Sequence, residues 1–112
     1  MSEFLYLYRG GRRGQTPEES QQIMQKWLAW MQNLTASGNL KDPGQPLEDE
    51  GKVVRDRATV TDGPYAEAKD LVGGFTLVEA DGIAQAAKLA GSCPILEVGG
   101  TVEVRPVMKM DM

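Results

Sequence analysis

Residues 3–9, E-F-L-Y-L-Y-R, constrain the fold most, because they predict a strand that is apolar on both faces. β-Forming residues alternate there without a helical period, so successive side chains point to opposite sides of a sheet. The two faces would carry, in turn, Phe4, Tyr6 and Tyr8, and Leu5, Leu7 and Arg9. A sheet that contains this strand must therefore be covered on both sides.

Residues 16–38 predict a long amphipathic helix. Thr16 can accept a hydrogen bond from the backbone N–H of Glu19, and Pro17 suits the first helical position. Apolar residues recur at helical spacing over about half of the circumference, namely Ile23, Met24, Trp27, Leu28, Trp30, Met31 and Leu34. Gly38 fits the left-handed position that closes such a helix. A stripe of this width is typical of a helix that packs on a sheet, so we interpret it as core and not as a cofactor site.

The remaining elements are shorter. We expect an irregular strand after residue 39, a turn at 49–51, strands at 52–55, 75–80 and 101–107, and a helix at 83–90 with Asp81 as its N-cap. The resulting order, β-α-β-β-α-β, predicts an α+β fold in which an antiparallel sheet carries both helices on one face. With 112 residues, the chain is long enough for a single domain, residues 1–112.

Two helices on one face leave the other face of the predicted sheet bare. The first strand has large apolar side chains on both sides, so the bare face would be a sizeable exposed apolar patch. Two copies that pair their sheets face to face across a twofold axis would remove this patch. We therefore predict a homodimer that forms through its sheet faces.

Residues 62–75, D-G-P-Y-A-E-A-K-D-L-V-G-G-F, combine special backbone residues with ionisable side chains. Asp62 can close a tight turn by accepting backbone N–H bonds, and a glycine pair before a strand suggests a bend or the close approach of another backbone. The residues expected to shape the loop are Gly63, Pro64, Gly73 and Gly74. Its candidate ligand contacts are Asp62, Tyr65, Glu67 and Lys69. Alternatively, it is a surface loop with solvated charges.

The run D-G-P-Y-A-E-A-K-D, followed by L-V-G-G-F-T-L-V-E-A, resembles the DGPF branch of the YCII-related family. That signature runs Asp-Gly-Pro-Phe-x-Glu-x-Lys-Glu and then Gly-Gly-Phe or Gly-Gly-Tyr, so Tyr65 and Asp70 are departures from it. The resemblance extends to V-V-R at 53–55, C-P at 93–94 and G-G-T-V-E-V-R-P at 99–106. It implies a ferredoxin-like domain that forms a dimeric α+β barrel through its sheets, and a family whose biochemical role is mostly unassigned.

Composition excludes several classes of function. The formal net charge of -4 argues against a nucleic-acid partner, and no apolar run approaches the roughly 20 residues of a membrane span. The N-terminal run M-S-E-F-L-Y carries an acid where a signal peptide is basic, and Cys93 is a lone cysteine, so we expect a cytoplasmic protein. The chain contains no histidine, which excludes a histidine base and the commonest zinc sites. We expect no metal and no cofactor.

One hypothesis for the function is enzymatic. A cleft between the 62–75 loop and the bare sheet face could hold a small polar organic substrate, with Asp62 as the base and Arg55 or Lys69 stabilising an anion. Tyr8 or Tyr65 would then donate a proton. The resemblance implies lyase-like or dehydrochlorinase-like relatives that use a histidine with an aspartate, and this chain lacks the histidine.

The other two hypotheses are non-catalytic. In one, the protein is a ligand-binding or regulatory dimer, and the resemblance implies an accessory role linked to alternative sigma factors. In the other, the motif only shapes the loop and seals the dimer edge. We favour a ligand-binding dimer with a polar pocket near the Asp-Gly-Pro loop, whose ligand contacts would be Tyr8, Arg55, Tyr65, Glu67 and Lys69.

Overall fold

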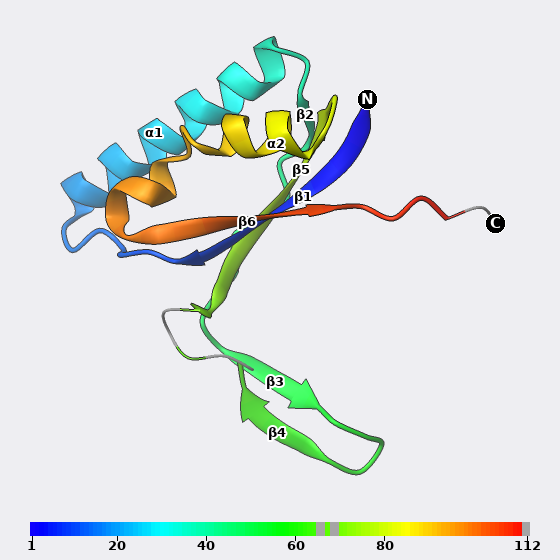
Figure 1. Ribbon diagram of the computed structural model, residues 1–112. Coiled ribbons are helices and arrows are strands. Elements are labelled where there is room, and N and C mark those ends of the chain that lie inside the picture. The colour runs from blue at the N-terminus through cyan, green and yellow to red at the C-terminus, as the bar shows by residue number, and fades with distance from the viewer. Residues whose placement is uncertain (65–66, 68–69, 111–112) are drawn as a thin grey trace.

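The structure is a computed structural model that describes residues 1–64, 67 and 70–110. Its elements follow in the order β1 (Ser2–Gly10), α1 (Pro17–Ala36), β2 (Leu40–Asp42), β3 (Gly51–Val54), β4 (Val60–Gly63), β5 (Val72–Ala80), α2 (Ile83–Ala90), η2 (Pro94–Val98) and β6 (Gly100–Pro106). Four of the strands form one antiparallel sheet in the order β2-β5-β1-β6. Both helices lie on one side of it (Figure 1), so the predicted ferredoxin-like α+β fold is confirmed.

The core lies between the helices and the face of the sheet that carries Phe4, Tyr6 and Tyr8, all of which are buried. The rings of Tyr6 and Trp30 stack with their centroids 6.1 Å apart, and Trp30 donates its indole N–H to Ser92 at 3.0 Å. Ala86 of α2 is fully buried, because its small side chain lets the helix approach the sheet closely.

Helix α1 begins as the sequence predicts. Thr16 accepts a hydrogen bond from the backbone N–H of Glu19 at 3.0 Å, and Gly38 follows the helix with a φ of 78°. Met24 and Leu28 are exposed, so the prediction that the whole apolar stripe lies in the core is wrong at these two positions. They line a groove, which is described below.

Helix α2 begins differently from the prediction. Its N-cap is Gly82, whose missing side chain makes no capping bond, and not Asp81. The backbone N–H of Asp81 instead donates to the side-chain carbonyl of Gln85 at 2.7 Å. Glutamine at this position therefore replaces the expected aspartate cap, because it reaches back over the first turn to bind a free backbone donor.

Strands β3 and β4 form a separate two-stranded hairpin, which we call the arm (residues 51–63). It is inserted between β2 and β5 and projects from the side of the sheet that lies opposite the helices (Figure 1). The sequence predicts a turn at Asp62 and Gly63, and this is wrong: both residues lie in β4, where Asp62 pairs with Lys52 and Gly63 with Gly51. Cross-strand pairing to β3 accounts for the difference.

The face of the sheet that points away from the helices, the open face, is apolar at its centre and charged around it. Leu5 pairs with Leu77 and Leu7 with Phe75 across β1 and β5, and all four side chains are half-buried. The surrounding charged residues are Glu3, Arg9, Lys41, Glu79, Glu103 and Arg105. The prediction that the helices cover one face only is therefore confirmed (Figure 1).

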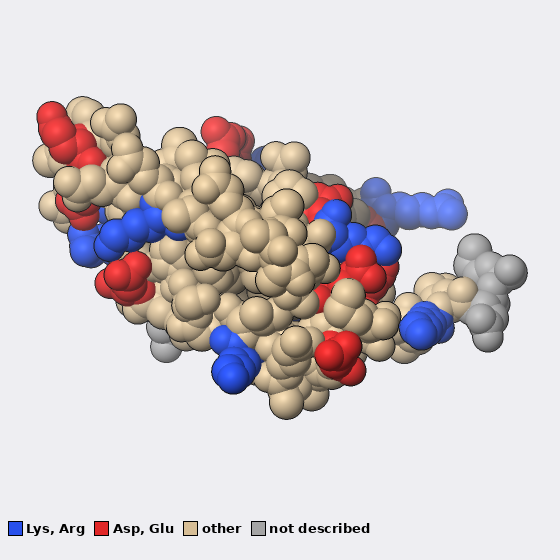
Figure 2. Space-filling view, turned by 90° about the horizontal axis from the view of Figure 1, so that it is seen from above, with Lys and Arg blue, Asp and Glu red and all other residues tan. Residues whose placement is uncertain are grey.

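Figure 2 shows the side of the molecule that carries the helices. Lysine, arginine, aspartate and glutamate lie around its margin, and the middle of this surface is uncharged. The exposed side of α1 is rich in neutral amides, among them Gln22, Gln25, Gln32 and Asn33. One charged residue of this side, Lys26, lies in the middle of α1, and its Nζ is 3.3 Å from Glu97 Oε1.

Candidate functional site

A wide hollow lies between residues 20–31 of α1, the loop after β1, residues 43–49 and the start of β5. It has a volume of about 950 Å³. Its walls are mainly apolar and include Met24, Trp27, Leu28, Met31, Leu47 and Phe75. A concave site of this size with apolar walls and a few polar groups is the usual form of a small-molecule site. We call it the groove.

One wall of the groove is the segment 43–47, which is held against β5 by its backbone. The N–H of Leu47 donates to the carbonyl of Gly73 at 2.8 Å, and the N–H of Phe75 donates to that of Gln45 at 3.3 Å. A Cβ atom on Gly74 would lie 3.0 Å from the Gln45 oxygen. This is the close backbone approach that the glycine pair indicates.

Gly44 makes the tightest of these contacts. Its φ is 71°, and a Cβ atom there would lie 1.8 Å from the carbonyl oxygen of Phe75. No other residue type could occupy this position without moving the segment, because any side chain would overlap the backbone of β5. Gly44 therefore fixes the width of the groove on this side.

The floor of the groove contains two linked hydroxyl groups. Tyr8 donates its phenol proton to Thr76 Oγ1 at 2.7 Å, and Thr76 donates in turn to the carbonyl oxygen of Pro43 at 2.9 Å. Burial raises the pKa of Tyr8, and the hydrogen bond to Thr76 opposes this only in part. The ring of Trp27 packs edge-on against Tyr8 with the centroids 4.9 Å apart. Tyr8 is therefore a neutral, fixed floor whose proton is already donated within the protein.

Two ion pairs lie at the rim. Arg12 pairs with Glu19 at the start of α1, and Arg13 Nη2 lies 2.9 Å from Asp49 Oδ1. The side chains of Arg13 and Asp49 are both well exposed, and such pairs contribute about 0–1 kcal/mol. The rim could therefore exchange a carboxylate of the protein for an acidic group of a ligand at little cost.

The structure places the predicted Asp62 and Arg55 on the arm. Asp62 has a side chain that is 90% exposed, and its Oδ1 lies 2.7 Å from Lys52 Nζ. Arg55 follows β3, where its backbone N–H donates to Thr59 at 2.9 Å. Neither residue lines the groove. Of the predicted ligand contacts, Tyr8 alone among the described residues lies in its lining.

For the other residues of the predicted loop, the structure describes fewer contacts. Tyr65 and Lys69 lie outside the described residues. Glu67 is exposed, and its carbonyl oxygen accepts a bond from the backbone N–H of Asp70 at 2.9 Å. The Gly63–Pro64 peptide bond is cis.

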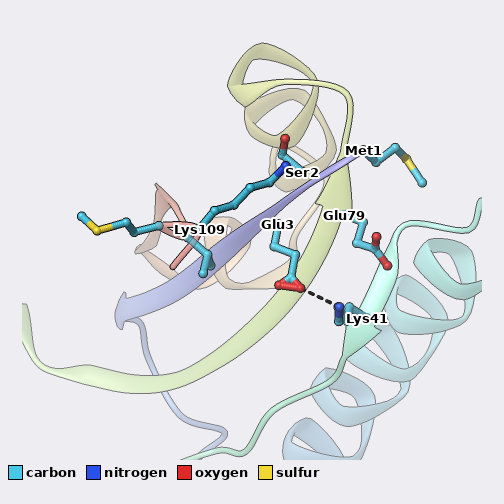
Figure 3. A pocket seen from close by; sticks show the side chains of 8 residues that line it. Met1, Ser2, Glu3, Lys41, Glu79 and Lys109 are labelled. Carbon is cyan, nitrogen blue, oxygen red and sulfur yellow. Dashed lines mark ion pairs between the residues drawn. The ribbon is translucent and has the colours of Figure 1, made fainter. Parts of the chain in front are cut away.

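A smaller, polar pocket lies at the other end of the sheet. Its volume is about 320 Å³, and its lining includes Glu3, Lys41 and Glu79 together with the chain ends, Met1 and Lys109 among them. Lys41 Nζ lies 2.6 Å from Glu3 Oε1 (Figure 3), and this hydrogen bond raises the pKa of Lys41. We call it the terminal pocket.

Sequence reasoning missed the groove because its parts are far apart in the chain. The helical spacing of Met24, Trp27 and Leu28 predicts that they belong to the core, and no pattern of neighbouring residues predicts that residues 43–47 pair with β5. The signal that could have found it is the breadth of the apolar stripe of α1, since Met24 and Leu28 of this stripe remain exposed and line the groove. In the part of the chain that the structure describes, no three His, Cys, Asp or Glu residues are grouped as metal ligands.

The fold and the groove define a ferredoxin-like α+β domain with a concave, mainly apolar site. The profile of the YCII-related domain matches residues 4–111, so the chain belongs to the YCII-related family. No curated protein matches it. None of the described helices is both long enough and apolar enough to cross a bilayer.

A solved structure has the same fold. It is the 5-chloro-2-hydroxyhydroquinone dehydrochlorinase from Burkholderia phenoliruptrix AC1100, in complex with 2,5-dihydroxybenzoquinone. The TM-score is 0.52 and the sequence identity is 22%, over 92% of this chain and 90% of the other. At this identity, the likeness shows the fold alone.

Proposed function

We propose that this protein binds a small, mostly apolar ring compound that carries an acidic group, and that it does so in the groove. The observation that carries the proposal is the aromatic and thioether lining of a 950 Å³ hollow whose rim holds Arg12 and Arg13. Apolar walls favour a ring, and an arginine can form two hydrogen bonds with a carboxylate or a phenolate. The tyrosine–threonine floor supplies a lone pair that can accept a hydrogen bond.

We further propose that the protein is a cytoplasmic member of the DGPF branch and acts as a homodimer that forms through the open face. Four half-buried apolar side chains form the centre of this face, and a second copy would bury the part of each that is still exposed, which is a fraction of the about 1.5–3 kcal/mol for a whole side chain. A second copy fits because the surface is complementary to itself in charge. In the register of the sheet, Glu3 and Arg9 are at opposite ends of β1, and Arg105 and Glu103 are opposite Leu5 and Leu7.

The charges also select how the two copies are oriented. If the twofold axis runs across the strands, Glu3 faces the partner's Arg9, and Arg105 faces the partner's Glu103. If the axis instead runs along the strands between β1 and β5, Glu3 faces the partner's Glu79, because these two residues pair across the sheet. Like charges in direct opposition are unfavourable, so the axis across the strands is preferred.

The groove is tested by ligand-induced stabilisation. Benzoate, hydroxybenzoates and 2,5-dihydroxybenzoquinone are the probes, and a probe at about 100 times its Kd stabilises the protein by about 2.7 kcal/mol. Met24→Glu puts a carboxylate on the groove wall, where it repels an acidic probe, and Gln25→Glu puts the same charge on the same helix outside the lining. The probe should stabilise the wild type and Gln25→Glu but not Met24→Glu. No stabilisation by any probe, or equal stabilisation of Met24→Glu, would contradict the proposal.

A second candidate function is lyase-like or dehydrochlorinase-like catalysis on such a ring compound. The fold shared with a dehydrochlorinase favours it, and the position of Asp62 does not, because its exposed carboxylate is paired with Lys52. Chloride release from a chlorinated hydroxyhydroquinone separates the two functions. Turnover that is lost in Met24→Glu would support an enzyme, and binding without chloride release would support a binding protein.

A further inference from the structure

The arm has an apolar surface that the described residues of its own chain leave exposed. Val54 and Val60 lie directly opposite each other on β3 and β4, with 70% and 56% of their surface exposed. The arm packs chiefly on itself, since β3 and β4 belong to no larger sheet. A two-stranded hairpin is at best marginally stable alone in water, and three strands or a packed face are needed for independent stability. The arm therefore requires a surface to pack on.

A second exposed apolar surface lies at the far end of the sheet. It consists of Met1, Val107 and Met108, which we call the terminal patch, and it borders the terminal pocket. Figure 3 shows this end, where Met1 extends away from the sheet beside Glu79. The backbone N–H of Val107 donates to the carbonyl of Glu3 at 3.0 Å, which fixes the patch to the edge of β1.

The proposed dimer brings these two surfaces together. The arm precedes β5 and therefore lies at the end of the sheet where β1 finishes, on the same side as the open face (Figure 1). The terminal patch lies at the opposite end, where β1 begins. A twofold axis across the strands exchanges the two ends, so the arm of one copy lies at the end of the partner that carries its terminal patch.

We infer that the arm of each copy packs its Val54–Val60 pair against the terminal patch of the second copy. We call this contact the clasp. The twofold symmetry gives two such contacts in the dimer, one from each arm, and both extend the interface between the open faces. The exposed ion pair of Lys52 and Asp62 would then lie beside the polar residues of the partner's terminal pocket. This inference rests on the proposed homodimer and adds the region through which each copy holds the other.

The test measures the dimer dissociation constant by sedimentation equilibrium for the full chain and three variants. Val54→Asp/Val60→Asp changes the arm, Val107→Asp/Met108→Asp changes the terminal patch, and Leu96→Asp is a matched control on an exposed apolar residue of η2. Each double variant should raise the dissociation constant about tenfold or more, since it removes buried apolar surface from two symmetric contacts. The control should leave the constant unchanged.

Hydrogen exchange at the arm, measured in the variant of the terminal patch, tests the contact between the two copies directly, because this variant does not change the arm itself. Val107→Asp/Met108→Asp should accelerate amide exchange at Val53 and Thr61 of the arm, although the substitutions lie at the other end of the sheet within each copy. A wild-type dimer whose dissociation constant and arm exchange are unchanged by this variant would overturn the clasp and leave the open-face dimer standing. A monomeric wild type would overturn the dimer itself and the clasp with it.

Discussion

Asp49 Oδ1 lies 2.9 Å from Arg13 Nη2, and this ion pair connects the segment before β3 to the loop after β1 at the rim of the groove. It joins two parts of the site that are 36 residues apart in the chain. Because both side chains are exposed, the pair holds the rim only loosely. The rim is therefore the part of the groove that a ligand could rearrange.

The two members of this ion pair should affect the binding of an acidic probe in opposite directions. Arg13→Ala removes the cation and should weaken binding, whereas Asp49→Ala removes a competing carboxylate and should strengthen it, each by about two- to fivefold. Isothermal titration with a hydroxybenzoate measures both. The free energy of unfolding in urea should change by less than about 1 kcal/mol in either variant. Changes of the same sign for the two variants would show that the pair acts structurally.

Gly44→Ala should be strongly destabilising. Both Gly44 and Gly38 have a positive φ, at 71° and 78°, but a Cβ atom meets the Phe75 carbonyl at the first and nothing within 4 Å at the second. Gly38→Ala should therefore cost only the conformational strain of about 1–2 kcal/mol. Gly44→Ala should cost a further 1–3 kcal/mol, roughly, for the overlap with β5. Urea unfolding of the two variants measures the difference, and equal losses would contradict the contact.

Alkaline pH should destabilise the protein through its buried tyrosines. Burial raises the pKa of Tyr6 from 10.0 to about 12, with a smaller contribution from Cys93, and it raises that of Tyr8 as well. At a pH between 10.0 and about 12, Tyr6 is deprotonated in the unfolded state and protonated in the folded state. The free energy of unfolding therefore falls as the pH rises through this range. Spectrophotometric titration with Tyr6→Phe as the control measures this. Ionisation of Tyr6 near its ordinary pKa in the folded protein would refute it.

Cys93 should be unreactive in the folded protein. Its side chain is buried, and desolvation raises the pKa of its thiol to about 12, so almost no thiolate is present at pH 8. A disulfide reagent should label it in urea within seconds and in buffer only as fast as the protein unfolds. Fast labelling in buffer would mean that the region around η2 opens readily.

Leu7→Asp should dissociate the proposed dimer. Leu7 lies at the centre of the open face, opposite Phe75, and a carboxylate there would be buried without a partner. Light scattering should give a monomer mass for this variant and a dimer mass for Leu96→Asp on the helix side. Exchanging the charges at Glu103 and Arg105 in one double variant should preserve the dimer, because each residue faces the other across the twofold axis. A wild-type monomer at micromolar concentration would contradict the assembly.

Local patterns were sufficient to predict most of the secondary structure. Helix α1 begins at Thr16–Pro17 because the capping residues are adjacent in sequence, and the β-forming residues 3–9 predict β1 because they alternate without a helical period. The open face was predicted for the same reason, since Leu5 and Leu7 must point away from Tyr6 and Tyr8. These features depend on neighbours within a few residues.

The candidate site depended on contacts that no local pattern encodes. The glycine and proline that follow Asp62 predict a turn there, but its pairing with Lys52 places Asp62 in β4, away from the groove. The groove itself requires Gln45 to lie against Phe75, and Met24 to face a gap that only the assembled sheet creates. Pairing between distant segments therefore decides which polar residues lie near a hollow.

The first and last residues of the arm, Gly51 and Gly63, are directly paired, so the chain leaves and rejoins the body at neighbouring points. Shortening or replacing the hairpin would leave β2 and β5 in register, because neither depends on it for pairing. None of the arm residues lines the groove, so the hairpin could change in length or sequence while the groove keeps its lining.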